Sequence, residues 1–207
     1  GKYNVKLNLK DIQKYLFPLK RLFTKYRPIR SVDQVKNFIQ EQSAQVSQMT
    51  LYGYLKTRMG AKHVIMFEDK DFLSSINIAK WHIYSASLID CTFFCFSFLY
   101  KDKKIEKIED ANKVFFEILN TEKANGMISE AYESATKEFN TRYPKIDWSN
   151  YYNSKPFEYS CNELYNWSPI ADELKKLDKK IVINSMFLKW NNVQNEFKRL
   201  TNKFGNI

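Results

Sequence analysis

Glycine and proline are scarce in this sequence, with five of each among 207 residues. No two glycines lie within four residues of one another. This spacing excludes the glycine-rich phosphate loops of nucleotide-binding proteins and the Gly-x-Ser-x-Gly turn of many hydrolases. The scarcity of turn residues also argues against β-sandwiches and propellers, which need many tight turns. Long helices joined by polar loops fit the composition better.

Cysteine and histidine are also few, with three Cys and two His. Because an odd number of cysteines does not favour a disulfide framework, we expect a reducing compartment. Cys91 and Cys95 are one helical turn apart, but phenylalanines surround them and no second pair follows at zinc-finger spacing. We therefore expect two core thiols, no metal site and no cofactor.

We expect neither a secretory leader nor a membrane-spanning segment, with a removed leader and a membrane span over 83–100 as the alternatives. Residues 1–10 lack the apolar region of a signal peptide. The longest apolar window, 83–100, contains Asp90, and an aspartate in the middle of a membrane span costs roughly 2.5 to 3.5 kcal/mol. We expect this window to form a buried core helix. The expected location is cytoplasmic, with peripheral attachment to the inner membrane as the alternative.

The positive charge is concentrated at the N-terminus. The formal net charge is +10, and nine of the 33 Lys and Arg but only one of the 23 acidic residues lie in residues 1–30. The other 177 residues are nearly balanced, with 24 basic and 22 acidic groups. A local excess of this kind predicts an anionic partner for one segment and not for the whole surface. We divide the chain into a basic arm, residues 1–30, and a helical bundle domain, residues 31–207.

The basic arm has the periodicity of an amphipathic helix that is kinked at Pro18. Its apolar face is formed by Ile12, Tyr15, Leu16, Leu19, Phe23 and Tyr26. Its candidate anion-binding residues are Lys10, Lys14, Arg21, Lys25, Arg27 and Arg30. Such a helix can pack on the bundle with its lysines in water, lie on an anionic membrane or follow a phosphate backbone. The expected partner is an anionic membrane surface or an acidic protein, with RNA as an alternative. No small-molecule ligand is predicted, and the oligomeric state stays open.

Helical spacing in the ordered segments predicts an all-α bundle of five to seven helices. Ser31 and Gln34 have the spacing of a capping box and should open a helix that stops at Gly60. Its expected core stripe is Val35, Phe38, Ile39, Gln42, Val46 and Met49. A long helix starting at Asp69 or Asp71 and ending at Tyr100 should lie at the centre, because it is apolar around most of its circumference. Two shorter helices should follow, one before the Asn125-Gly126 break and one ending at Pro144.

The last third of the chain is harder to interpret. Residues 143–166 are rich in Tyr, Asn and Ser without a sustained period, which predicts a long loop. Ser168-Pro169 should start the last and longest helix. Its expected stripe is Ile170, Leu174, Leu177, Ile181, Met186, Trp190, Val193, Phe197, Leu200 and Phe204. The step of five from Ile181 to Met186 predicts a bend or a change of packing partner. The expected core includes Phe72, Ile76, Ile83, Trp190, Val193 and Phe197.

One polar group on the central helix is a candidate catalytic site. His82, Asp90 and Ser85 or Ser87 lie on the predicted 69–100 helix, where an imidazole and a carboxylate could activate a hydroxyl. The alternative is a satisfied polar network in the core, which is the more common role of such residues.

The segment 50–60 contains an unusual glycine. Gly53 lies between Tyr52 and Tyr54 in the middle of a predicted helix, where glycine costs about 1 kcal/mol relative to alanine. It should permit a close helix contact or clear space beside the two tyrosines. Lys56 and Arg58 lie near the helix C-terminus, where cations are favoured.

At these residues the sequence resembles a family of alphaproteobacterial proteins without a settled function. The resemblance covers Leu51-Tyr52-Gly53-Tyr54-Leu55-Lys56-Thr57-Arg58-Met59-Gly60, then Met66-Phe67-Glu68-Asp69 and Ser75-Ile76-Asn77-Ile78-Ala79-Lys80. Members of the family are sometimes labelled esterases, but this chain has no Gly-x-Ser-x-Gly motif. The resemblance implies a bacterial compartment and no mechanism.

Taken together, these patterns predict a non-enzymatic helical binding or adaptor module whose basic N-terminal helix engages an anionic partner. Two alternatives stay open. The first is a hydrolase with a site around His82 and Asp90, and the second is an RNA-binding protein that uses the basic arm with exposed tyrosines.

Overall fold

A computed structural model describes residues 27–60 and 69–205 of the chain. The described part contains six α-helices, two short 3-10 helices and no strand. In chain order they are α2 (Val32–Gly60), α3 (Asp69–Lys101), α4 (Glu109–Ala124), α5 (Ser129–Arg142), η2 (Tyr143–Lys145), η3 (Tyr151–Asn153), α6 (Glu158–Trp167) and α7 (Asp172–Leu200). The prediction of an all-α bundle of five to seven helices is confirmed. The predicted helix of the basic arm, including Pro18, lies outside the described residues.

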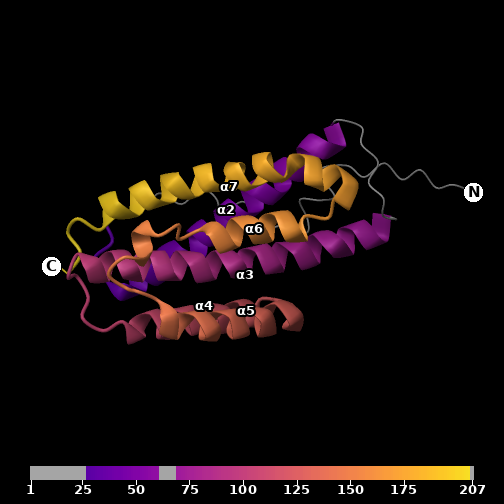
Figure 1. Cartoon of the computed structure of the whole chain (residues 1–207). Coiled ribbons are helices and arrows are strands. Elements are labelled where there is room, and N and C mark those ends of the chain that lie inside the picture. Colours follow the sequence, from indigo (N-terminus) through magenta and orange to yellow (C-terminus); the bar gives the residue numbers. More distant parts are fainter. Residues whose placement is uncertain (1–26, 61–68, 206–207) are drawn as a thin grey trace, which may run out of the picture.

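Helix α3 is the centre of the bundle. It contacts α2 and α6 on one side and α4 and α5 on the other (Figure 1). Every residue from 81 to 99 is buried, as expected for a helix that is apolar around most of its circumference. With 33 residues α3 is also the longest described helix. The prediction that the last helix is the longest was therefore wrong, since α7 has 29 residues.

The apolar length of α3 raises the question of a membrane span. Residues Asp71–Lys101 are the one described segment that is long and apolar enough to cross a bilayer, by length and composition only. In the fold, 94% of its most apolar window is buried by the other helices.

The six residues that were expected in the core are all buried. They are Phe72, Ile76, Ile83, Trp190, Val193 and Phe197.

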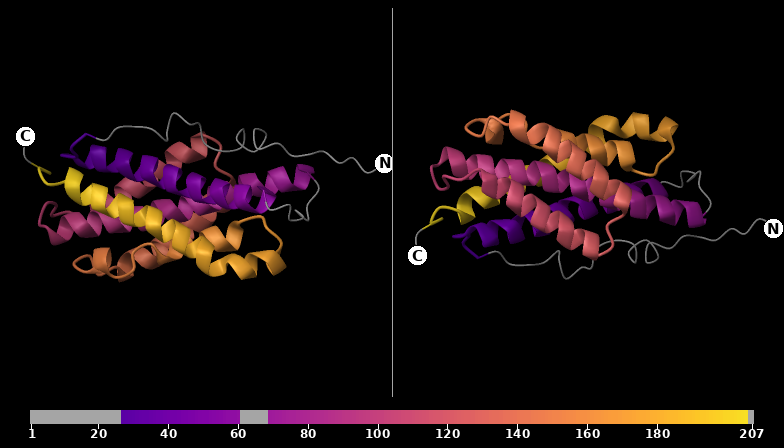
Figure 2. Two further views of the ribbon diagram at one scale, coloured as in Figure 1. Left: turned by 90° about the horizontal axis from the view of Figure 1, so that it is seen from above. Right: turned by 90° about the horizontal axis from the view of Figure 1, so that it is seen from below.

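Helix α7 lies over the seam between α2 and α6 (Figure 2). It runs antiparallel to α2: Ile29 N–H donates to the Leu200 carbonyl at 2.8 Å, whereas at the other end Arg58 bonds to Asp178. The second half of α2 therefore lies beside the first half of α7, which is where the candidate site is found.

The start of α2 follows the predicted cap. Ser31 Oγ accepts from Gln34 N–H at 3.3 Å, and Gln34 Oε1 accepts from Arg30 N–H at 2.6 Å. The Gln34 side chain thus accepts from the N–H of Arg30, whereas in a standard capping box it would accept from the N–H of the cap residue, Ser31. The expected stripe of α2 is buried except for Met49, which is 40% exposed. That part of the prediction was wrong because α2 turns Met49 toward the edge of α7 and not toward α3.

The predicted loop over 143–166 was also wrong, because it contains η2, η3 and α6. Helix α6 has only ten residues, and three of them are buried, Ser160, Cys161 and Leu164. A helix this short, with a serine and a cysteine on its inner face, shows no clear apolar period.

The last helix starts later in the sequence than predicted. Ser168 Oγ donates to the Leu164 carbonyl at 2.6 Å, so Ser168 ends α6 and does not cap the next helix. Helix α7 begins at Asp172, with Ala171 as its N-cap. The chain needs the intervening residues to turn from α6 onto α7.

Helix α7 also faces the core differently from the predicted stripe. Its buried residues are Lys175, Val182, Met186, Trp190, Val193, Phe197 and Leu200. Val182, and not Ile181, turns inward, so the step of five disappears and the buried face is continuous. Leu177 and Ile181 are each 73% exposed, which contradicts their assignment to the core.

Candidate functional site

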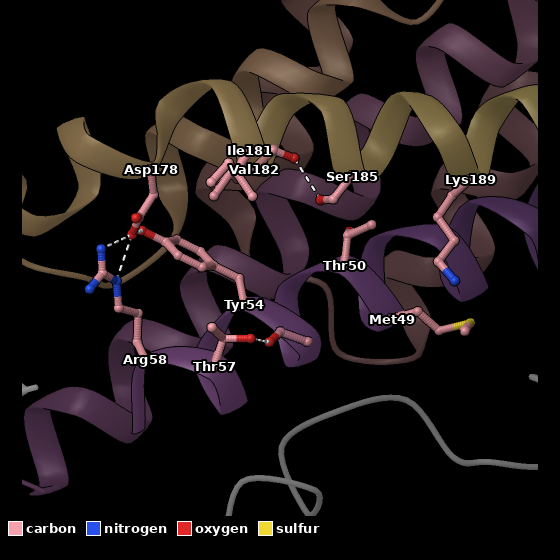
Figure 3. Close-up of a pocket in the computed structure, with 11 residues that line it drawn as sticks. Met49, Thr50, Tyr54, Thr57, Arg58, Asp178, Ile181, Val182, Ser185 and Lys189 are labelled. Carbon is pink, nitrogen blue, oxygen red and sulfur yellow. Dashed lines mark hydrogen bonds and ion pairs between the residues drawn. The ribbon is translucent and has the colours of Figure 1, made fainter. Parts of the chain in front are cut away.

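A groove with a volume of about 470 Å³ lies between α2 and α7 (Figure 3). We call it the α2–α7 groove. Its lining residues are Met49, Thr50, Gly53, Tyr54, Thr57, Arg58, Asp178, Ile181, Val182, Ser185 and Lys189. Three of the residues singled out in the sequence, Gly53, Tyr54 and Arg58, therefore meet at one site. The other two, Tyr52 and Lys56, do not line it.

One end of the groove is closed by a hydrogen-bonded cluster around Asp178. Tyr54 Oη donates to Asp178 Oδ2 at 2.7 Å, and Arg58 Nε donates to the same oxygen at 2.5 Å. Arg58 also donates to the Leu174 carbonyl at 3.2 Å. Burial, and then the bond to Asp178, raise the pKa of Tyr54 well above its usual value. The bond to Asp178 raises the pKa of Arg58, so this end of the groove holds a neutral phenol and a matched ion pair.

Gly53 forms part of the groove wall on α2. A methyl group at this position would meet no atom within 4 Å, and the residue is exposed. The expectation of a close helix contact was therefore wrong, and the alternative, cleared space beside Tyr54, fits the structure. Thr57 Oγ1 donates to the Gly53 carbonyl at 2.9 Å, which keeps that hydroxyl within its own helix.

Lys189 lies at the opposite end of the groove from Tyr54, Arg58 and Asp178 (Figure 3). It is half-buried and makes no hydrogen bond or ion pair with the residues that the structure describes. The groove thus has one end whose charges are matched and one end with an unmatched cation.

Beside the groove, α7 carries a row of exposed aliphatic side chains. Leu177 and Ile181 are 73% exposed and Leu188 is 66% exposed. Their spacing of four and seven residues places them on one face of the helix. We call these three residues the α7 apolar stripe. Helical spacing predicts Leu177 and Ile181 in the core, and it gives no signal for Leu188 or Lys189.

Asp90 is fully buried and bound by groups from two other helices. Arg142 Nη1 donates to Oδ1 at 3.0 Å, and the Ser160 N–H donates to Oδ2 at 2.7 Å. Arg142 also donates to Tyr151 Oη at 2.6 Å. Burial raises the pKa of Asp90 to about 6, although Arg142 and Ser160 act in the opposite direction. Asp90 therefore belongs to a structural network between α3, α5, η3 and α6.

His82 lies in a different environment on the same helix. Its ring stacks on Trp167 with centroids 3.7 Å apart and an interplanar angle of 5°. Its Nε2 atom is 3.9 Å from Glu130 Oε1. Burial lowers the pKa of His82, and Glu130 and Glu163 oppose that shift.

The structure does not bring the candidate catalytic residues together. His82 and Asp90 are eight residues apart on α3, which is about 12 Å along the helix axis. Ser85 Oγ donates to the His82 carbonyl, and Ser87 Oγ donates to the Ile83 carbonyl. Asp90, Ser85 and Ser87 thus bond to other groups, and the buried His82 Nε2 makes no hydrogen bond in the described part of the chain. These four side chains therefore do not form the chain of hydrogen bonds that a triad requires.

Most of the candidate anion-binding residues, Lys10, Lys14, Arg21 and Lys25, lie outside the described residues. The last two, Arg27 and Arg30, are exposed at the start of the described chain. Because Ile29 is buried and bonded to Leu200, Arg27 and Arg30 are held next to the C-terminal end of α7.

The cysteines are free and buried, with Cys91 Sγ 4.0 Å from Cys95 Sγ. Across residues 27–60 and 69–205, no three His, Cys, Asp or Glu side chains are grouped so that they could hold a metal ion.

Comparisons of the chain with protein-family models, with curated proteins and with solved structures found no match.

Proposed function

We propose that this chain is a non-enzymatic helical module that attaches to an anionic membrane surface. The observation that carries the proposal is the α7 apolar stripe, where three large aliphatic side chains are between 66% and 73% exposed on one helix face. Single exposed leucines are ordinary on a protein surface. A row of them beside an apolar groove indicates a surface that something apolar covers.

The charges beside the stripe favour a membrane over an acidic protein. Lys180 is exposed one helical turn after Leu177, and Lys189 lies on the groove side of Leu188. Aliphatic side chains flanked by lysines are typical of helices that lie in a membrane interface. Protein interfaces, in contrast, are enriched in aromatic residues and arginine and depleted in lysine.

The basic arm supplies the second part of the contact. It contains nine Lys and Arg and one acidic residue, and each basic group near an anionic surface contributes about 1 kcal/mol. Arg27 and Arg30 lie at the C-terminal end of the same helix that carries the stripe. We propose that the arm and the stripe act on one surface.

Co-sedimentation with lipid vesicles tests the proposal. The whole chain is expected to bind vesicles of phosphatidylglycerol mixed with phosphatidylcholine and to bind pure phosphatidylcholine poorly. Binding should weaken as the Debye length falls from about 10 Å at 0.1 M salt to about 3 Å at 1 M salt.

Two sets of variants separate the arm from the stripe. Lys14→Glu, Arg21→Glu and Lys25→Glu together should abolish the salt-dependent binding, and Leu177→Ser with Leu188→Ser should weaken it without unfolding the protein, because both leucines are exposed. Lys137→Glu, on an exposed position of α5, is the matched control. Equal binding by all variants contradicts the proposal, and so does binding of polyglutamate or RNA in place of the vesicles.

A further inference from the structure

We propose that the α2–α7 groove binds a single aliphatic chain that ends in an anionic group, such as a long-chain carboxylate or a single-chain phospholipid. This ligand site differs from the proposed membrane attachment, although the two share Ile181. The ligand uses the inside of the groove, whereas Leu177 and Leu188 lie outside it.

The size and walls of the groove fit an aliphatic chain. Its volume of about 470 Å³ lies within the range of small-molecule sites, roughly 300 to 1,000 Å³. Met49, Ile181 and Val182 supply apolar walls (Figure 3). The open space above Gly53 leaves room for methylene groups where any other residue would place a side chain.

The hydroxyl groups along the groove are already engaged. Thr50 Oγ1 donates to the Val46 carbonyl at 2.7 Å, and Ser185 Oγ donates to the Val182 carbonyl at 2.7 Å. Because these hydrogens stay within their own helices, the middle of the groove offers little to a polar ligand.

The two ends of the groove set the direction of the ligand. At one end Asp178 matches the charge of Arg58 and accepts from Tyr54, so an ionic head group there would have to break an existing pair. At the other end Lys189 is half-buried and without a partner among the described residues. A carboxylate or phosphate beside Lys189 would make a charge-assisted hydrogen bond, whereas a cation would be repelled.

The distance between the ends sets the chain length. Asp178 and Lys189 are eleven residues apart on α7, which is about 16 Å along the helix axis. An extended chain advances roughly 1.2 Å per bond, so this length accommodates about thirteen bonds, which is a chain of roughly twelve to fourteen carbons. Dodecanoate is therefore the first probe to use.

Calorimetric titration of the whole chain without vesicles tests the site. Dodecanoate represents the long-chain carboxylates, and lysophosphatidylglycerol represents the single-chain phospholipids. Dodecanol is the uncharged control and dodecyltrimethylammonium is the cationic control. We expect one ligand per chain, with dodecanoate at least tenfold tighter than either control.

Three variants locate the ligand. Lys189→Met should weaken dodecanoate binding about tenfold and leave dodecanol binding unchanged. Gly53→Leu should abolish the binding of both, because its side chain fills open space in the groove. Lys137→Met, on α5, should bind as the unaltered chain does, and circular dichroism checks that Gly53→Leu is folded.

Several results would overturn the proposal: no saturable binding, equal binding of the cationic control, or binding that neither Lys189→Met nor Gly53→Leu changes. The chain could instead self-associate through the groove. In that case dodecanoate would fail to dissociate the oligomer and Gly53→Leu would abolish it, which would place a second copy of the chain in the groove. Because the titration contains no vesicles and leaves the arm and Leu177 intact, its failure would not affect the proposed membrane attachment.

Discussion

Gly53 shows how one residue shapes the α2–α7 groove. It lies inside helix α2. Glycine is unfavourable in a helix because it loses more backbone conformational freedom on folding than any other residue type does. A methyl group here would meet no atom within 4 Å. The glycine is therefore not needed for helix packing, and the space it leaves is part of the groove.

Replacing Gly53 with alanine should stabilise the fold. Gly53→Ala is expected to raise the free energy of unfolding by about 0.5 to 1 kcal/mol, because alanine is the better helix former and its methyl group has room. The urea midpoint of the whole chain measures this change. Gly126→Ala is the matched control: Gly126 has a φ of 105°, so a side chain there should destabilise. A loss of stability in Gly53→Ala would show that the position is not open.

At the scale of elements, α2 and α7 are joined at one end by a polar cluster. Tyr54 and Arg58 are one turn apart on α2, and both donate to Oδ2 of Asp178 on α7. The side chains of Arg58 and Asp178 are 12% and 19% exposed. This partial burial protects the pair from solvent screening, so it should contribute more than a surface salt bridge does.

A double-mutant cycle measures the contribution of this cluster. Tyr54→Phe and Asp178→Asn are expected to show a coupling energy of about 1 kcal/mol or more, because the phenol donates to a carboxylate. The Lys36–Glu117 pair, with side chains 31% and 40% exposed, is the control and should couple by about 0.5 kcal/mol or less. Chemical denaturation of the four chains of each cycle gives both values. Equal coupling in the two cycles would contradict the role assigned to Asp178.

For the whole molecule, Asp90 is the point at which the helices α3, α5 and α6 are tied together. It lies on α3, accepts from Arg142 at the end of α5 and from the Ser160 N–H on α6, and reaches η3 through Arg142 and Tyr151. A buried ion pair of this kind is costly to break, because the remaining partner keeps an unmatched charge. We therefore interpret Asp90 as a structural residue of the fold.

The raised pKa of Asp90 predicts how stability depends on pH. Its ordinary value is 3.8, and burial raises it to about 6 in the fold. Between these values the folded chain binds more protons at Asp90 than the unfolded chain does, so the contribution of Asp90 to stability falls as pH rises from about 4 to about 6. Asp90→Asn has no such titration. Its free energy of unfolding, relative to that of the unaltered chain, should therefore increase across this range.

Urea unfolding at several pH values between 4 and 7 tests this prediction. Because Asp90→Asn leaves Arg142 without its partner, the double variant Asp90→Asn, Arg142→Met serves as a second chain in which neither charge of this pair remains. A stability difference that stays constant or decreases with rising pH would contradict the assignment of the shifted pKa to Asp90.

Local sequence patterns were enough to predict where most of the helices lie and which residues form the central core. In α2 to α5 the apolar side chains recur at helical spacing, and Gly60, Asn125-Gly126 and Pro144 mark helix ends, so local chemistry is enough. The same local signal singled out Gly53, Tyr54 and Arg58. It failed for α6, which has only ten residues and a partly polar inner face.

The tertiary structure decided which face of α7 is buried and which residues complete the site. Val182 and Ile181 are neighbours of similar hydrophobicity, and only the packing of α7 on α2 and α6 turns the first inward and leaves the second exposed. Asp178 and Lys189 are more than a hundred residues from the α2 side chains that they face. Such contacts depend on how two distant helices are rotated and aligned against each other, and no local periodicity specifies that rotation.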